Sequence, residues 1–149
     1  MPAEQEQKSR IVVGVDGSEP AQAALRWAVR QARLTGAVID AVTAWEIPIA
    51  LGRFGSARSA PPDDAQVRQV AEQTAAEAIE AVADPADAVQ IRTQVREGNA
   101  AGVLLAAADG ADLLVVGNRG RGGFARALLG SVSLHCVQYA HGSVVVIRA

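Results

Sequence analysis

The hydrophobic residues of this chain follow two alternating patterns. Short runs of Val, Ile, Leu and Ala alternate with longer segments in which apolar residues recur every three or four positions. Short apolar runs are typical of strands buried in a sheet, whereas the longer periodic segments are typical of amphipathic helices. We therefore expect five strands, in the segments RIVVGVD (10–16), AVIDAVTAW (37–45), VQIRTQV (89–95), DLLVVG (112–117) and SVVVIR (143–148).

The first helix is marked at both ends by residues that favour helix termini. Ser18 stands at an N-cap position, Pro20 falls in the first turn, and Gly36 follows the last apolar position. Such residues satisfy or tolerate the unpaired backbone groups at helix ends. The apolar positions at helical spacing are Ala21, Ala24, Leu25, Ala28 and Ala32.

Three further helices are expected. One begins at Asp64 and ends near Asp84, because Pro85 disfavours helix in the residue before it. A short one covers NAAGVLLAAADG (99–110), closed by Gly110, and another follows Gly130-Ser131. Residues 46–64, rich in Gly, Pro, Ser and Ala, predict a long loop. The second helix is expected to carry on one face Val67, Val70, Ala71, Thr74, Ala75, Ala78 and Val82.

Strands and helices therefore alternate along the chain. Such alternation predicts parallel strands joined by right-handed crossovers, with helices on both faces of the sheet. A length of 149 residues suits one domain, and no linker divides the chain. We expect a polar N-terminal tail over residues 1–9 and one α/β domain, a doubly wound five-stranded parallel sheet, over residues 10–149.

Composition and charge limit the partners and the compartment. The formal net charge is −2, which gives no general argument for binding nucleic acid or an anionic membrane. With Cys136 as the single cysteine, no internal disulfide forms. The N-terminal residues lack the apolar segment of a signal peptide, and no apolar run is long enough to span a bilayer. We expect a soluble cytoplasmic protein.

Two turns that follow strands carry the candidate chemistry. Asp16 lies in the turn GVDGS after the first strand, and the segment GNRGRGGFARALLGS follows the fourth strand. In an open parallel sheet, ligands bind at the carboxyl ends of strands where the strand order reverses. If the first and fourth strands are neighbours there, both turns line one crevice.

The residue types in these turns fit a nucleotide. Gly117 and Gly120 let the backbone approach a ligand, and successive N–H groups can form an anion-binding nest. Gly130-Ser131 opens a helix whose N-terminus favours a phosphate, and Ser131 and Ser133 add hydroxyl donors. The segment between them also supplies Asn118, Arg119 and Arg121, where each arginine is either a phosphate ligand or a solvated loop charge. Asp16 would accept hydrogen bonds from a ribose or face a metal-bound polyphosphate, or it simply caps the first helix.

The spacing of Gly117, Gly120 and Gly130-Ser131 resembles the G-x2-G-x9-G-(S/T) motif of the ATP-binding branch of the universal stress protein family. VVGVDGS resembles the family's first strand and turn, AVTAWE its second strand, and the resemblance covers nearly the whole chain. It implies a Rossmann-like fold of the adenine nucleotide alpha hydrolase-like type, with strand order 3-2-1-4-5. It also implies an ATP site lined by Gly14, Val15, Asp16, Ala44, Gly117, Gly120, Gly130, Ser131, Val132 and Ser133.

The resemblance further implies a nucleotide-dependent stress-response sensor or regulator that forms a homodimer through its C-terminal strand. Three alternatives stay open: a slow ATP hydrolase or phosphotransferase, a module for AMP or a cyclic nucleotide, and an interaction module with an empty site. A Walker A lysine is absent and no general base is evident, which favours binding over catalysis. A requirement for Mg²⁺ is left open, and His135, Cys136 and His141 match no zinc spacing.

Overall fold

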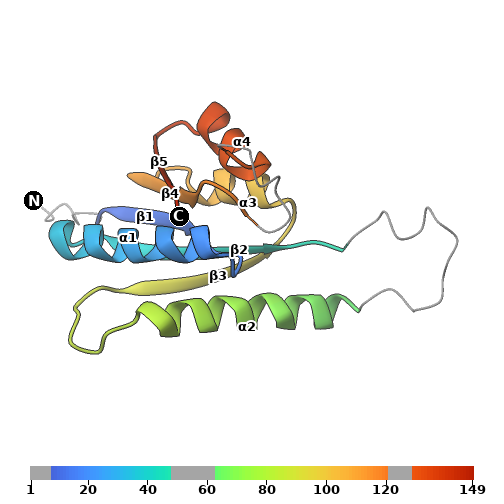
Figure 1. The fold of residues 1–149 in the computed structure, drawn as a ribbon, viewed down its shortest axis with the longest axis horizontal. Coiled ribbons are helices and arrows are strands. Elements are labelled where there is room, and N and C mark those ends of the chain that lie inside the picture. Colours follow the sequence, from blue (N-terminus) through green and yellow to red (C-terminus); the bar gives the residue numbers. More distant parts are fainter. Residues whose placement is uncertain (1–7, 48–62, 121–128) are drawn as a thin grey trace, which may run out of the picture.

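The computed structural model describes residues 8–47, 63–120 and 129–149 (Figure 1). Residues 1–7 of the expected tail, residues 48–62 of the expected long loop, and Arg121 lie outside the described residues. The elements are β1 (Arg10–Gly14), α1 (Glu19–Thr35), β2 (Val38–Trp45), α2 (Asp64–Val82), β3 (Ile91–Glu97), α3 (Ala100–Ala107), β4 (Leu113–Gly117), α4 (Ser131–Tyr139) and β5 (Ser143–Ile147).

The sheet has the predicted architecture. All four strand pairs are parallel and the order is β3-β2-β1-β4-β5, so the strand order reverses between β1 and β4. Helices α1 and α2 cover one face, and α3 and α4 cover the other (Figure 1). The α/β fold and the strand order expected from the sequence are thus confirmed. No helix in the described part of the chain is both long and apolar enough to cross a membrane.

Helix α1 forms where its capping residues indicate. The Ser18 side chain accepts a hydrogen bond from the Ala21 N–H at 3.3 Å, and Gly36 closes the helix in the left-handed conformation, at a φ of 77°. All five apolar positions read from the sequence are buried, together with Val29. The face that α1 presents to the sheet is made mostly of alanines, which allows the helix to lie close to β1 and β4.

Helix α2 begins at Asp64 as expected, but its buried face is narrower than the sequence indicated. Ala71, Ala75 and Ala78 are buried, whereas 61% of Val70 is exposed. Successive helical residues are rotated by about 100°. Val70, directly before Ala71, therefore points away from the sheet, and its placement on the apolar face was wrong.

Several element boundaries differ from the prediction, most clearly those of β3 and α3. The third strand was expected at residues 89–95, but β3 pairs with β2 from Ile91, opposite Ile39, to Glu97, opposite Trp45. Its range follows from the extent of β2 rather than from its own apolar pattern. Helix α3 ends at Ala107, and Gly110 lies in the following turn with a φ of 75°.

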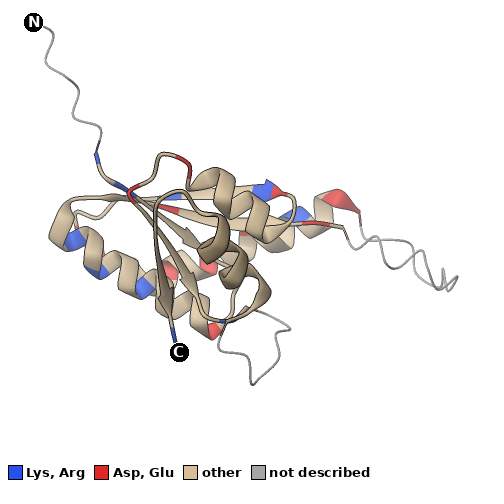
Figure 2. Cartoon of the chain, turned by 90° about the horizontal axis from the view of Figure 1, so that it is seen from above, with Lys and Arg blue, Asp and Glu red and all other residues tan. Residues whose placement is uncertain are grey.

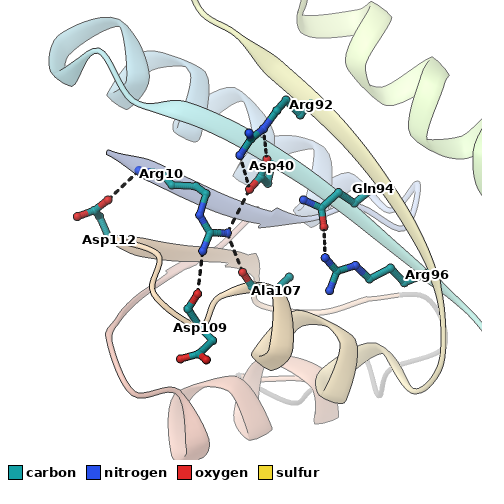
Figure 3. Close-up of polar contacts among 8 residues, drawn as sticks. All are labelled: Arg10, Asp40, Arg92, Gln94, Arg96, Ala107, Asp109 and Asp112. Carbon is teal, nitrogen blue, oxygen red and sulfur yellow. Dashed lines mark hydrogen bonds and ion pairs between the residues drawn. The ribbon is translucent and has the colours of Figure 1, made fainter. Parts of the chain in front are cut away.

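A buried carboxylate joins three strands toward the amino ends of the sheet. Asp40 of β2 is 1% exposed and accepts hydrogen bonds from Arg92 of β3 at 2.7 and 3.1 Å. Arg10 of β1 donates to the same carboxylate at 3.1 Å, and to the carbonyl oxygens of Ala107 and Asp109 at 2.8 Å (Figure 3). The network therefore ties β1, β2 and β3 to the end of α3.

Two opposing effects set the charge state of Asp40. Burial disfavours the carboxylate, but the hydrogen bonds and charges of Arg92 and Arg10 outweigh it and lower the pKa of Asp40 below its ordinary value. A carboxyl group whose pKa is lower in the folded than in the unfolded protein stabilises the fold above its unfolded pKa. That stabilisation is lost as the pH falls through the folded value.

We expect Asp40→Asn to lower the free energy of unfolding at pH 7 by about 2–4 kcal/mol, because it leaves two guanidinium groups beside a neutral amide. Urea unfolding of both proteins at pH 7 and near pH 3 measures the effect. The difference should narrow at the lower pH, since Asp40 of the unfolded wild-type chain takes up a proton below about pH 4, whereas the folded carboxylate holds its charge to lower pH.

Asp87→Asn is the matched control, because Asp87 pairs with Arg33 at the surface. Exposed ion pairs contribute about 1 kcal/mol or less. An Asp40→Asn protein as stable as the wild type at pH 7, or a difference that grows on acidification, would contradict this account.

Candidate functional site

The two turns singled out from the sequence meet in the structure. They follow β1 and β4, which are neighbours at the point where the strand order reverses. The carboxylate of Asp16 lies so close to Gly120 that a Cβ atom at Gly120 would be 2.7 Å from Asp16 Oδ2. A side chain at position 120 therefore cannot be accommodated without moving the carboxylate.

A cavity of about 80 Å³ opens between these turns and the carboxyl ends of β1, β2 and β4. Asp16 and Arg119 are the two charged side chains among its described lining residues, and most of the others are small or aliphatic. Nine of the residues expected at the site line it, namely Gly14, Val15, Asp16, Ala44, Gly117, Arg119, Gly120, Val132 and Ser133.

Four expected residues do not line the described cavity. Asn118, Gly130 and Ser131 lie beside it, and Arg121 is outside the described residues. The chain approaches the cavity again at α4, where Val132 and Ser133 form part of its wall. The structure thus brings the turn of Asp16, the start of the glycine-rich segment and the start of α4 around one space.

Gly117 meets a different requirement from the one expected. A Cβ atom there would lie 2.6 Å from the carbonyl carbon of Pro20 and 2.8 Å from the backbone nitrogen of Ala21. Contacts this short with backbone cannot be relieved by a side-chain rotation. Gly117 is therefore needed for the close approach of β4 to the first turn of α1.

Backbone hydrogen bonds hold the two ends of the glycine-rich segment together. The carbonyl oxygen of Asn118 accepts from the N–H of Gly130 at 2.6 Å and from the hydroxyl of Ser133 at 3.0 Å. The N–H of Asn118 donates to the carbonyl of Ile147 on β5 at 2.8 Å. Ser133, which is 2% exposed, thus uses its hydroxyl proton inside the protein, so its expected role as a donor to phosphate does not fit this arrangement.

Helix α4 begins at the cavity without a side-chain cap. Helices α1, α2 and α3 are capped by the side chains of Ser18, Asp63 and Asn99. The N-cap of α4 is Gly130, which has no side chain to accept a hydrogen bond. The first N–H groups of a helix have no partner within it, and they favour an anion. The uncapped start of α4 therefore offers backbone donors at one side of the cavity.

Asp16 also has a local role. Its Oδ1 atom accepts hydrogen bonds from the backbone N–H of Ser18 at 2.8 Å and from the Ser18 hydroxyl at 2.5 Å. These bonds fix the turn that leads into α1, where Gly17 has a φ of 82°. The turn thereby holds the carboxylate toward Gly120, at the edge of the cavity.

The sequence did not reveal that α3 forms a wall of the cavity. Leu104 and Ala100 both line it, and a Cβ atom at Gly14 would lie 2.9 Å from Cδ1 of Leu104. The apolar composition of the α3 segment predicted a buried helix, but no local pattern indicated which strand ends it would cover. Gly14 thus makes room for Leu104.

Positively and negatively charged residues both occur on several elements of the described part of the chain (Figure 2). Lysine and arginine are interspersed with aspartate and glutamate over the helices and strands (Figure 2). The described residues contain no cluster of three or more His, Cys, Asp or Glu side chains suited to a metal ion. Cys136 is buried in the core, and burial raises the pKa of its thiol to about 11.

Comparison with known proteins places this arrangement in a family. The model of the universal stress protein family matches residues 8–148. A universal stress protein from Mycolicibacterium smegmatis is 38% identical over 93% of this chain, which corresponds to 47% of that relative. The chain therefore spans about half the length of the curated relatives that it matches.

Solved structures of universal stress proteins have a similar fold. The universal stress protein UspA from Lactobacillus plantarum is 28% identical, with a TM-score of 0.71 over 95% of this chain and 99% of that one. A universal stress protein in complex with cAMP is 26% identical, with a TM-score of 0.60 over 95% of this chain and 97% of that one. By its sequence over almost its whole length, and by its fold, the chain belongs to the universal stress protein family.

Proposed function

We propose that the cavity between Asp16 and Gly120 is an adenine-nucleotide site, that its ligand is ATP, and that the protein acts in the cytoplasm as a nucleotide-dependent stress-response regulator. The contact of the two turns at the switch point of the sheet is the observation that carries the proposal. This contact places the Asp16 carboxylate, which can accept hydrogen bonds from sugar hydroxyls, beside the glycine-rich segment and the uncapped start of α4. The cAMP complex of a related protein adds support.

We assign the parts of a nucleotide to the walls of the cavity that suit them chemically. The apolar surface of Val42, Ala44 and Leu104 suits a base, and the carboxylate of Asp16 suits ribose hydroxyls. The N–H groups at the start of α4 and the guanidinium of Arg119 suit phosphates. A volume of about 80 Å³ holds only part of a nucleotide, so the phosphates would lie along the open edge.

A cyclic nucleotide is the second candidate ligand, because the structural relative with bound cAMP has a comparable fold over nearly its whole length. It would use the same base contacts and the 2′-hydroxyl of its ribose, because its 3′ oxygen is part of the single cyclic phosphate. Calorimetric titrations with ATP, AMP and cAMP rank the three ligands. Recovery of intact ATP after long incubation with Mg²⁺ separates a binding protein from a slow hydrolase or phosphotransferase.

We also propose that β5 pairs with β5 of a second copy. β5 is the last strand of the sheet, and its outer edge pairs with no described strand. Beside it, α4 exposes Leu134, Val137 and Tyr139. An apolar edge strand favours pairing with another chain, and a twofold dimer satisfies both copies at once.

We expect Asp16→Ala to weaken ATP binding roughly 10- to 150-fold while leaving inorganic tripolyphosphate nearly unchanged. The carboxylate is proposed to accept hydrogen bonds from the ribose, and a hydrogen bond to a charged group contributes about 1.5–3 kcal/mol. Isothermal titration calorimetry with both ligands measures the difference. Asp16→Asn is the control for the turn, because one amide oxygen can still accept from Ser18. Equal weakening of the two ligands would contradict the ribose contact.

We expect a homodimer at micromolar concentration, and we expect Val146→Pro to shift it toward monomer. The carbonyl of Ile147 points to β4, so the backbone of the preceding residue, Val146, faces the open edge. Proline removes its N–H without breaking the ladder inside the sheet. Light scattering of Val146→Pro and of the matched Val146→Ala measures the change. Monomeric wild type, or equal dimerisation of the two variants, would place the interface elsewhere.

A further inference from the structure

The β2 wall of the cavity continues sideways onto β3. Val42 and Ala44 line the cavity, and their partners across the parallel ladder are Gln94 and Arg96. Paired residues of neighbouring strands project from the same face of a sheet. Gln94 and Arg96 therefore stand directly beside the cavity, on the face covered elsewhere by α3.

Arg96 is held on this flank in an accessible position. Its Nη2 atom donates to Oε1 of Gln94 at 2.6 Å, and its side chain is exposed (Figure 3). Arg92, which precedes Arg96 on β3 and projects from the same face, is bound instead to the buried carboxylate of Asp40. Among the described residues, no acidic side chain forms an ion pair with Arg96.

Small residues separate Arg96 from the cavity. Its neighbour on β2 is Ala44, which carries only a methyl group, and Ala100 at the start of α3 is equally short. A guanidinium group on a flexible stem can therefore extend over Ala44 when it leaves Gln94. Planar guanidinium groups stack on aromatic rings and donate to ring nitrogens, and they do so most strongly where water is partly excluded.

We propose that Arg96 is a specificity-determining residue of the nucleotide site, where it covers the base from the open flank of β3. The inference rests on the proposed nucleotide function, since it assigns the base to the wall formed by Val42 and Ala44. Gln94 holds the guanidinium beside the site before the ligand arrives. Arg96 thus acts on the base and ribose end of the ligand, and the α4 end of the site acts on the phosphates.

The test compares Arg96→Ala with the wild-type chain, using ATP, adenosine and tripolyphosphate as probes in calorimetric titrations. We expect ATP and adenosine to bind roughly 2- to 30-fold more weakly to the variant, with tripolyphosphate unchanged. Arg30→Ala, which removes an exposed arginine from α1, is the control for the loss of one positive charge.

Each contrary outcome has a distinct meaning. Unchanged affinity for ATP and adenosine overturns the proposal, and so does a loss shared equally by tripolyphosphate, which indicates a phosphate contact. A comparable loss in Arg30→Ala also overturns it, because the effect is then one of net charge. Failure of the wild-type chain to bind ATP, AMP and cAMP instead contradicts the proposed function itself, before any variant is compared.

Discussion

The close approach of Gly117 to the first turn of α1 is the constraint on which the candidate site depends. A Cβ atom at this position would lie 2.6 Å from the backbone of Pro20, so β4 can reach α1 only with glycine at its end. That contact fixes where the glycine-rich segment leaves the sheet, beside the turn of Asp16. The hydrogen bonds of Asn118 to Gly130 and Ile147 then fix where α4 begins. The packing contact of Gly117 and the hydrogen bonds of Asn118 thus together position three separate parts of the chain.

The charged groups at the two ends of the sheet are arranged differently. Toward the amino ends, the charge of Asp40 is matched by two guanidinium groups and is buried. Such a network is costly to break on one side only, and it therefore holds β1, β2 and β3 in one register. Toward the carboxyl ends, Asp16 and Arg119 border a cavity, and helix α4 starts without a side-chain cap. Polar groups there face a space that a ligand can enter.

Features set by local chemistry could be predicted from the sequence, and features set by distant contacts could not. The caps Ser18 and Gly36 placed α1, because capping is decided within one turn of helix. The range of β3 depends on its partner strand, and the wall formed by Leu104 depends on how α3 crosses the sheet. The spacing of the glycines indicated a site. Only the structure shows that Gly117 allows β4 to pack against Pro20.

Residues that are not the most favourable ones for their local structure are found together at the carboxyl ends of the strands. Glycine at an N-cap costs a helix only a few tenths of a kcal/mol relative to a good capping side chain, and α4 starts with Gly130 where the other three helices in the described ranges have a side-chain cap. Glycine also has the largest backbone entropy to lose on folding, and several stand together here. Proteins usually keep such local costs where function requires them. The buried alanines of α1 and α2 and the Asp40 network lie away from this edge, so the local costs at the carboxyl ends fall where the candidate site is.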